Sequence, residues 1–308
     1  MEQESMISAA TEEYIRHCRF ERELDEKTIS AYRVDLEQFA TVVGGDPPLR
    51  EVSQECMKAW LGSLAHYKPR TVKRKVASLM SFMHYLECAC ASFENPFRRM
   101  QVKIKRPETL PRVMSGSEVK RMLAHLEREA GTIGAKRQKR YICVRDWAVV
   151  ELLFCTGMRI GELCRLKNED VDLAEGRVRI HGKGDKERIV DICPAEALAA
   201  LRAWMTIRQS GSRATDAVFT NRLGNGLATQ SVRAMVHDLA RKCDIRKNVT
   251  PHMFRHTFAS LLLEEDVDVA YIQHILGHSS IATTQIYLHV NPKRQREILM
   301  NRHPRARL

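Results

Sequence analysis

Hydrophobic residues in the first third of the chain recur at helical spacing. Between residues 29 and 39 they are separated by steps of 3, 4 and 3 residues, which places them on one face of an α-helix. A second stripe follows a turn rich in glycine and proline, and Pro69 then opens a longer helix, because proline favours the first helical position. The apolar faces comprise Ile29, Tyr32, Leu36 and Phe39, then Met57, Trp60, Leu61 and Leu64, then Val72, Val76, Leu79, Met83 and Leu86. Residues 1–97 are therefore predicted to form an all-helical domain.

A basic segment that contains prolines separates this region from the rest. Residues 98–112 hold six Lys or Arg residues against a single acid, Glu108, and are predicted to form an extended linker. A second domain is predicted over residues 113–291, followed by a basic tail at 292–308. Its first helix begins at residues 115–118, and the nearly all-apolar stretch 147–155 predicts a buried helix that ends at Gly157.

The pattern then changes to the alternation of a β-hairpin. Val178 and Ile180 alternate with polar residues, residues 182–185 form a turn, and residues 189–192 return. Helical patterns follow: Thr250 and Pro251 begin one helix, Gly277 ends the next, and a last helix is predicted to begin near residue 280. The expected fold is mainly α-helical with a small antiparallel β-sheet.

The charge balance adds a partner to this picture. A net charge of +12 favours a polyanion, because each phosphate that Lys or Arg neutralises releases condensed counterions. The alternative is a basic protein whose charged helix faces are merely solvated. The basic stretch at residues 131–141 is predicted to be a surface loop. The candidate contacts to a nucleic-acid backbone are Arg70, Lys73, Arg74, Lys75, Arg98, Arg99, Lys103, Lys105 and Arg106.

Cysteine usage and hydropathy limit the other classes. The nine cysteines are odd in number and scattered, and they contain no Cys-x-x-Cys, which disfavours both a disulfide framework and a zinc ribbon. Reduced cysteines are typical of the cytoplasm. The N-terminus has no apolar signal core, and no apolar run approaches the roughly 20 residues that span a bilayer. A cytoplasmic protein that does not contact a membrane is expected.

Residues 250–258 carry a possible phosphate site. Cleavage of a phosphodiester without a metal needs a nucleophile, fixed cations and a proton donor. His252 and Arg255 lie three residues apart, so they project from one side of a helix, and a helix N-terminus favours anions. The planar guanidinium of arginine can bind two phosphate oxygens. The alternative is ordinary polarity at a helix end.

A metal site is a competing interpretation of the same histidines. His252 and His256 are four apart, as in a zinc-binding helix, but Met253 replaces the expected Glu, and Arg255 would repel a divalent cation. His274 and His278 share this spacing, but Gly277 interrupts the helix between them. No metal and no cofactor are predicted.

Four segments together resemble one family. They are Thr156-Gly-Met-Arg-Ile-Gly-Glu-Leu, His181-Gly-Lys-Gly-Asp-Lys-Glu-Arg, His252-Met-Phe-Arg-His and Leu276-Gly-His-Ser-Ser-Ile-Ala-Thr-Thr-Gln-Ile-Tyr-Leu-His. Their order and approximate spacing are similar to those of the tyrosine recombinases, which include phage-type integrases and Xer-type resolvases. The resemblance covers roughly residues 12–295.

The resemblance implies a role for each matching residue. Arg159 and Arg255 would bind the scissile phosphate, and Glu162, three residues after Arg159, would orient that arginine. Lys183 would donate a proton to the departing 5′ oxygen, and His252 would be the general base. His278 would donate a hydrogen bond to the phosphate, and Tyr287 would be the nucleophile.

Tyr271 is the competing candidate for the nucleophile, but it lies in an apolar helical stretch and matches no catalytic position. The ordinary phenol pKa near 10 means that Tyr287 needs nearby cations or a base to attack at neutral pH. The family also implies a C-shaped clamp on double-stranded DNA with specific core sites. Four protomers would act on two sites through a Holliday junction, with or without a second recombinase or an accessory factor.

Several alternatives stay open from sequence alone. A non-catalytic DNA-binding regulator and a relaxing type IB topoisomerase share this chemistry or fold. The sequence does not separate a chromosome-dimer resolvase from a mobile-element integrase, and it does not specify the DNA site. In the tail, the apolar run at residues 298–300 could dock on a neighbouring protomer, or the tail could be a plain basic extension.

Overall fold

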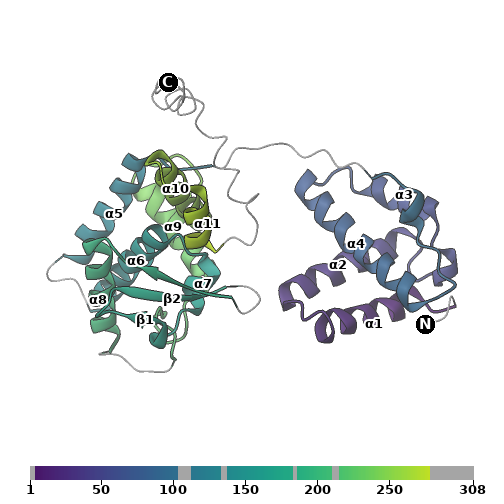
Figure 1. Ribbon diagram of the computed structural model, residues 1–308, viewed down its shortest axis with the longest axis horizontal. Helices are drawn as coiled ribbons and strands as arrows, with labels where there is room; N and C mark the ends of the chain where they lie inside the picture. The colour runs from purple at the N-terminus through teal and green to yellow at the C-terminus, as the bar shows by residue number, and fades with distance from the viewer. Residues whose placement is uncertain (1–3, 103–111, 133–136, 183–185, 210–214, 278–308) are drawn as a thin grey trace, which may run out of the picture. The chain divides into compact units, whose positions relative to one another are not determined.

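The computed structural model describes residues 4–102, 112–132, 137–182, 186–209 and 215–277. The chain divides into two compact units, residues 1–109 and 110–308 (Figure 1). The division lies within the basic segment predicted as a linker. In the described residues, helices dominate and one small antiparallel sheet is present, as the hydrophobic pattern predicted.

The first unit is built from helices alone. Its α-helices are α1 (Ile7–Phe20), α2 (Glu26–Val42), α3 (Gln54–Ser63) and α4 (Pro69–Ala89), with the 3₁₀ turns η1 (Leu49–Glu51) and η2 (Pro96–Arg99). Asp25 and Ser53 begin α2 and α3 by accepting a hydrogen bond from a backbone N–H of the first turn. The largest buried side chains are Tyr14, Phe39, Trp60 and Phe82. The predicted helical stripes therefore do form the core.

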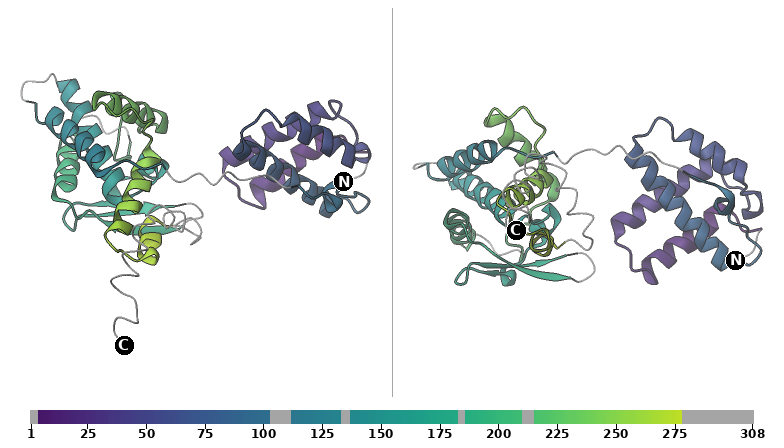
Figure 2. Two further views of the ribbon diagram at one scale, coloured as in Figure 1. Left: turned by 90° about the horizontal axis from the view of Figure 1, so that it is seen from above. Right: turned by 45° about the horizontal axis from the view of Figure 1, so that its top comes forward.

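The second unit is arranged around one buried helix, α6 (Arg137–Thr156), which packs against α5 (Gly116–Ala130), α8 (Ala195–Gln209) and α10 (Pro251–Glu264) (Figure 1). The other helices are α7 (Ile160–Arg165), η3 (Asn168–Asp170), α9 (Thr229–Lys242) and α11 (Val269–Leu276). Ser115 and Glu118 form a reciprocal capping box at the start of α5, as predicted. The two views of Figure 2 show the strands gathered at one end of this unit.

The sheet contains β1 (Val171–Asp172), β2 (Arg177–His181) and β3 (Glu187–Asp191) in that order. The hairpin prediction is confirmed: β2 and β3 pair antiparallel, with Val178 opposite Val190 and Ile180 opposite Arg188. Because opposite residues share a face, Arg188 lies on the same side as buried Val178 and Ile180.

The prediction of a surface loop over residues 131–141 is wrong at its C-terminal end. Arg137 already begins α6, so the basic residues that follow it belong to the first turns of a helix. Residues 133–136 lie outside the described part of the chain. Charged residues obscured the start of this helix, because its apolar pattern becomes continuous only further along.

Candidate active site

A sharp turn between α6 and α7 presents Arg159. The turn depends on Gly157, whose φ of +59° is a left-handed conformation that favours glycine. A Cβ atom at this position would lie 2.6 Å from Cδ2 of Leu276 and 2.7 Å from Cδ1 of Phe258. The loop therefore has no room for a side chain, and Arg159 follows as the residue that precedes α7.

Glu162, which the resemblance assigns to the orientation of this arginine, binds it through two hydrogen bonds. Its Oε2 accepts a hydrogen bond from the backbone N–H of Arg159 at 2.8 Å, and its Oε1 accepts one from Nη1 of the same residue at 2.8 Å. Burial of the carboxyl would raise its pKa, but hydrogen bonds from Arg188 and Arg159 lower the pKa to about 2. The carboxylate is therefore ionised across the physiological range, while the side chain of Arg159 stays 40% exposed.

Arg188 completes this network and was not predicted as a site residue. Its Nη2 donates to Oε2 of Glu162 at 2.7 Å, and its Nε donates to the carbonyl of Ile275 at 3.0 Å. The sequence did contain a signal, because alternation along β3 places Arg188 on the face of buried Val190. In a hairpin with several exposed arginines, this alternation alone does not distinguish a buried arginine from an exposed one.

Arg255 connects the Arg159 turn to the end of α11. Pro251 occupies the first position of α10, and Thr250 precedes it as predicted, although the Thr250 side chain makes no capping bond. From the buried side of this helix, Arg255 donates to the carbonyl of Gly157 at 2.7 Å and to that of Leu276 at 2.8 Å. Arg255 therefore binds a backbone carbonyl that lies two residues before Arg159 in the sequence.

His252 lies on the same helix end, where it reaches solvent. Desolvation by its surroundings lowers its pKa, and the positive charges of Arg255, Arg233 and Arg159 lower the pKa further. A lowered pKa keeps the imidazole neutral and able to accept a proton near pH 7. Arg233, an exposed residue of α9, is a second cation that the sequence analysis missed.

His256, the second histidine of the competing metal-site interpretation, is half-buried on α10. Desolvation, with the charges of His252 and Arg255, lowers its pKa. Within the residues that the structure describes, no group of three or more His, Cys, Asp or Glu side chains could hold a metal ion.

The described residues on either side of Lys183 are joined by hydrogen bonds and ion pairs. The imidazole of His181 contacts Asp170 at 2.8 Å and Glu187 at 3.0 Å, and the Gly182 N–H donates to the carbonyl of Lys186 at 2.7 Å. The hydrogen bond with Asp170 raises the pKa of His181. Lys183 itself lies outside the described residues.

Two further predicted site residues, His278 and Tyr287, also lie outside the described residues, as do the last predicted helix and the tail. The described chain reaches Gly277, which ends α11 in a left-handed conformation with φ +64°, as predicted. The competing tyrosine, Tyr271, is 70% exposed on α11.

The basic residues of α4 divide into two groups. Arg70, Lys73 and Arg74 are exposed, in keeping with a surface that could meet DNA. The prediction for Lys75 is wrong: the residue is 3% exposed, and its Nζ binds Oδ1 of Asp35 at 2.9 Å. A helix turns by about 100° per residue, so the last of the three consecutive basic residues 73–75 lies on the buried face.

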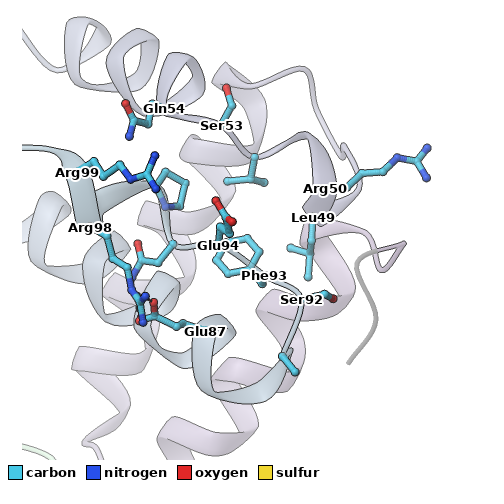
Figure 3. Close-up of a pocket in the computed structure, with 14 residues that line it drawn as sticks. Leu49, Arg50, Ser53, Gln54, Glu87, Ser92, Phe93, Glu94, Arg98 and Arg99 are labelled. Carbon is cyan, nitrogen blue, oxygen red and sulfur yellow. Dashed lines mark hydrogen bonds and ion pairs between the residues drawn. The ribbon is translucent and has the colours of Figure 1, made fainter.

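Arg98 and Arg99 are exposed beside a cavity of about 710 Å³ in the first unit (Figure 3). Arg98 forms an ion pair with Glu87, and Glu94 also lines the cavity. Arg50 lines it as well, so the cavity is bordered by three arginines and two glutamates. The other predicted linker contacts, Lys103, Lys105 and Arg106, lie outside the described residues.

Comparisons with known proteins cover both units. The model of the phage integrase family matches residues 112–294, and that of the phage integrase N-terminal SAM-like domain matches residues 11–89. A tyrosine recombinase of Agathobacter rectalis is 42% identical over 292 residues, which cover 95% of each chain. Tyrosine recombinase XerD of Listeria innocua is 32% identical and covers 96% of this chain and 98% of its own.

Solved structures agree with these relatives. The XerA recombinase is 30% identical with a TM-score of 0.54, and the match covers 96% of this chain and 99% of that one. The XerH site-specific recombinase, solved in a post-cleavage complex with a palindromic difH substrate, has a TM-score of 0.76 at 22% identity; the match covers 96% of this chain and 84% of that one. The second likeness shows a shared fold.

None of the described helices is long and apolar enough to cross a membrane. The matched family model covers more than half of the chain, and the relatives cover nearly all of it. The chain therefore belongs to the phage integrase family of tyrosine recombinases, enzymes that cleave and rejoin DNA.

Proposed function

We propose that the chain performs site-specific recombination with Tyr287 as the nucleophile and with Arg159 and Arg255 as the cations that bind the scissile phosphate. The observation that carries this proposal is the junction between α7 and α10. There, Arg255 donates to the carbonyl of Gly157, only two residues before Arg159. The guanidinium group of Arg255 therefore contacts the turn that presents Arg159, which supports a shared role of the two cations at a pentacoordinate phosphorus.

In the proposed reaction, the phenolic oxygen of Tyr287 forms a bond to phosphorus, and the bond to the 5′ oxygen breaks. Lys183 supplies the proton for the departing oxygen, while His278 donates a hydrogen bond to the phosphate. The 3′-phosphotyrosine linkage conserves the energy of the broken phosphodiester bond. Religation therefore proceeds by attack of a 5′ hydroxyl and needs no nucleotide cofactor.

His252 is proposed to accept the phenolic proton. This role is supported by its lowered pKa, because an imidazole that is neutral near pH 7 can act as a base. The same lowered pKa disfavours a role as a permanently charged phosphate ligand, which leaves that task to the arginines.

The proposed substrate is double-stranded DNA with short core sites, on which four protomers act at two sites. The DNA substrate is supported by the structural neighbour XerH, which was solved with its difH substrate, and by the exposed cations of α4. Because the proposed substrate is DNA, we expect the enzyme to work inside the cell, in the cytoplasm.

The test needs a DNA site, which can be obtained by repeated selection of a random-sequence duplex pool on the full-length protein. Duplexes with single nicks tiled along this selected site should trap a covalent protein–DNA adduct, because a nicked strand releases the fragment that would otherwise religate. Mass mapping of the adduct should identify Tyr287.

A Tyr287→Phe variant should bind the selected duplex with unchanged affinity and form no adduct. A Tyr271→Phe variant is the matched control and should form adduct at the rate of the unaltered protein. An adduct on another residue, or equal yield from Tyr287→Phe, would remove Tyr287 from the reaction. Relaxation of plasmids without sequence preference or recombinant products would favour a topoisomerase.

A further inference from the structure

Arg188 joins three parts of the candidate site through one guanidinium group. Its two terminal nitrogens bind the two carboxylate oxygens of Glu162, at 2.7 and 3.3 Å, and its Nε binds the carbonyl of Ile275. The side chain is 8% exposed, so these bonds are formed in a largely dry environment. A paired fork of this kind fixes direction as well as distance.

We propose that Arg188 is a positioning residue, which holds Arg159 toward the phosphate through Glu162 and keeps it in register with the end of α11. The inference rests on the proposed function, since it assigns Arg159 to the phosphate. It goes beyond that function because it gives a role to a residue that is not expected to touch DNA.

The shared carboxylate explains how the effect would reach Arg159. Glu162 uses one oxygen for the backbone N–H of Arg159 and the other for its side chain. Arg188 binds the same two oxygens through its two terminal nitrogens, so it restricts rotation of the carboxylate to which Arg159 is bound. Without Arg188, a carboxylate with a 3% exposed side chain would lose a buried counter-charge.

The end of α11 supplies the second half of the argument. Its last two carbonyls are each bound by an arginine: that of Ile275 by Arg188, and that of Leu276 by Arg255. Cations at a helix C-terminus also offset its partial negative charge. A Cβ added at Gly277 would lie 3.1 Å from Cδ of Arg188, which shows how closely this side chain packs there. The two arginines thus anchor the point from which the chain continues to His278.

Lysine cannot replace this residue, because it has a single nitrogen. It cannot bind both oxygens of Glu162 in a bidentate pair and also bind the carbonyl of Ile275. Arg188→Met and Arg188→Lys are therefore the informative variants. Arg177→Met is the matched control, since Arg177 also pairs with a carboxylate of the sheet, Asp191 at 2.9 Å, but on the exposed face.

The first measurement needs no activity. Amide hydrogen exchange of the full-length protein should become faster at Arg159, whose N–H is bound to Glu162, and at the end of α11 in Arg188→Met. Arg177→Met should leave both regions unchanged. Unaltered exchange at Arg159 in a folded Arg188→Met protein would overturn the proposal, whatever the enzyme does to DNA.

The second measurement separates positioning from general stability. At saturating selected duplex, Arg188→Met should lower the rate of adduct formation by about 10- to 100-fold, the size expected when a catalytic group is displaced by about 1 Å. In an Arg159→Lys background, the same change should cost less than about 3-fold, because the group it positions is already impaired.

If Arg188→Met fails to fold, Arg188→Lys decides: a smaller loss that disappears in the Arg159→Lys background is expected. Full activity in Arg188→Lys, or losses that multiply in the double variant, would overturn the proposal. Failure of the proposed function has a different signature, since Arg159→Lys alone would then leave adduct formation unchanged.

Discussion

Each unit of the protein contains a buried carboxylate bound to two cations, one buried and one about half-exposed, yet the two networks serve different ends. In the second unit, Glu162 binds Arg188 and Arg159, whose side chains are 8% and 40% exposed. These residues come from α7, β3 and the turn before α7, and the buried cation also binds the end of α11.

In the first unit, Asp35 binds Lys75 and Arg74, whose side chains are 4% and 45% exposed. Both cations are neighbours on α4, and Lys75 also binds Gln38 of α2 and lies over the ring of Tyr67. All of these contacts join α4 to the elements that surround it in the core.

The difference lies in what the buried cation reaches. Lys75 ends among side chains of the helical core, so its network fastens two helices. Arg188 ends on a backbone carbonyl next to the candidate active site, so its network can transmit position to a reacting group. The same electrostatic arrangement therefore serves stability in one unit and geometry in the other.

The largest expected effect is on the stability of the first unit. Asp35→Ala leaves the ammonium of Lys75 buried without its anion and should lower the free energy of unfolding by about 3–5 kcal/mol. Urea unfolding, with hydrogen exchange on α2 and α4, measures this. The combined variant Asp35→Leu with Lys75→Met should recover most of the loss. A change below about 0.5 kcal/mol in the single variant would contradict the assigned role.

The two half-exposed arginines should separate chemistry from binding. Arg159→Ala should slow adduct formation at saturating selected duplex by about 10²- to 10³-fold, as expected when one transition-state donor is lost. Arg74→Ala should instead weaken DNA binding and reduce the slope of log affinity against log salt by about one. Gel-shift titrations and single-turnover rates distinguish these outcomes. If both variants lose only affinity, the contrast between the networks fails.

Acid should reveal the Glu162 network. Its folded pKa of about 2 lies below the unfolded value, so the stabilisation is present above about pH 4.5 and is lost as the pH falls toward 2. The stability difference between the unaltered protein and Glu162→Gln should shrink over this window by as much as about 3 kcal/mol. Urea unfolding from pH 6 downward measures it. A difference that is independent of pH would contradict the lowered pKa.

The smallest expected effect concerns Arg233. Because its charge helps to lower the pKa of His252, Arg233→Gln should raise that pKa and move the acid limb of the adduct-formation rate to higher pH. The neutral imidazole is the active form, so activity declines as the pH falls through its pKa. Arg241→Gln, an exposed variant on the same helix, should leave the profile in place. Identical shifts in both variants would indicate a general charge effect.

Most of the helices and the hairpin could be predicted because periodicity depends on neighbouring residues. Arg159, Glu162, His252 and Arg255 lie in short motifs, so their grouping could be expected before the fold was known. Their residue-level roles in DNA cleavage, like those of Lys183, His278 and Tyr287, stay predictions.

Long-range partners were beyond this reasoning. Lys75 was misassigned because Asp35 lies 40 residues away on another helix. The residues next to Lys75 in the sequence do not indicate that it pairs with a buried carboxylate. Arg188 was missed because its partners, Glu162 and the carbonyl of Ile275, are 26 and 87 residues distant. Such pairs are formed by tertiary packing, which the spacing of residue types along the sequence does not reveal.

Gly157 gives the site a narrow tolerance to mutation. One added methyl group would strain a left-handed backbone and press on Leu276 and Phe258 together. Arg255 donates hydrogen bonds to the carbonyls of both Gly157 and Leu276. Substitution of Gly157 by alanine would therefore disturb both of these hydrogen bonds. Variation in this protein should therefore spare a residue that has no functional group of its own.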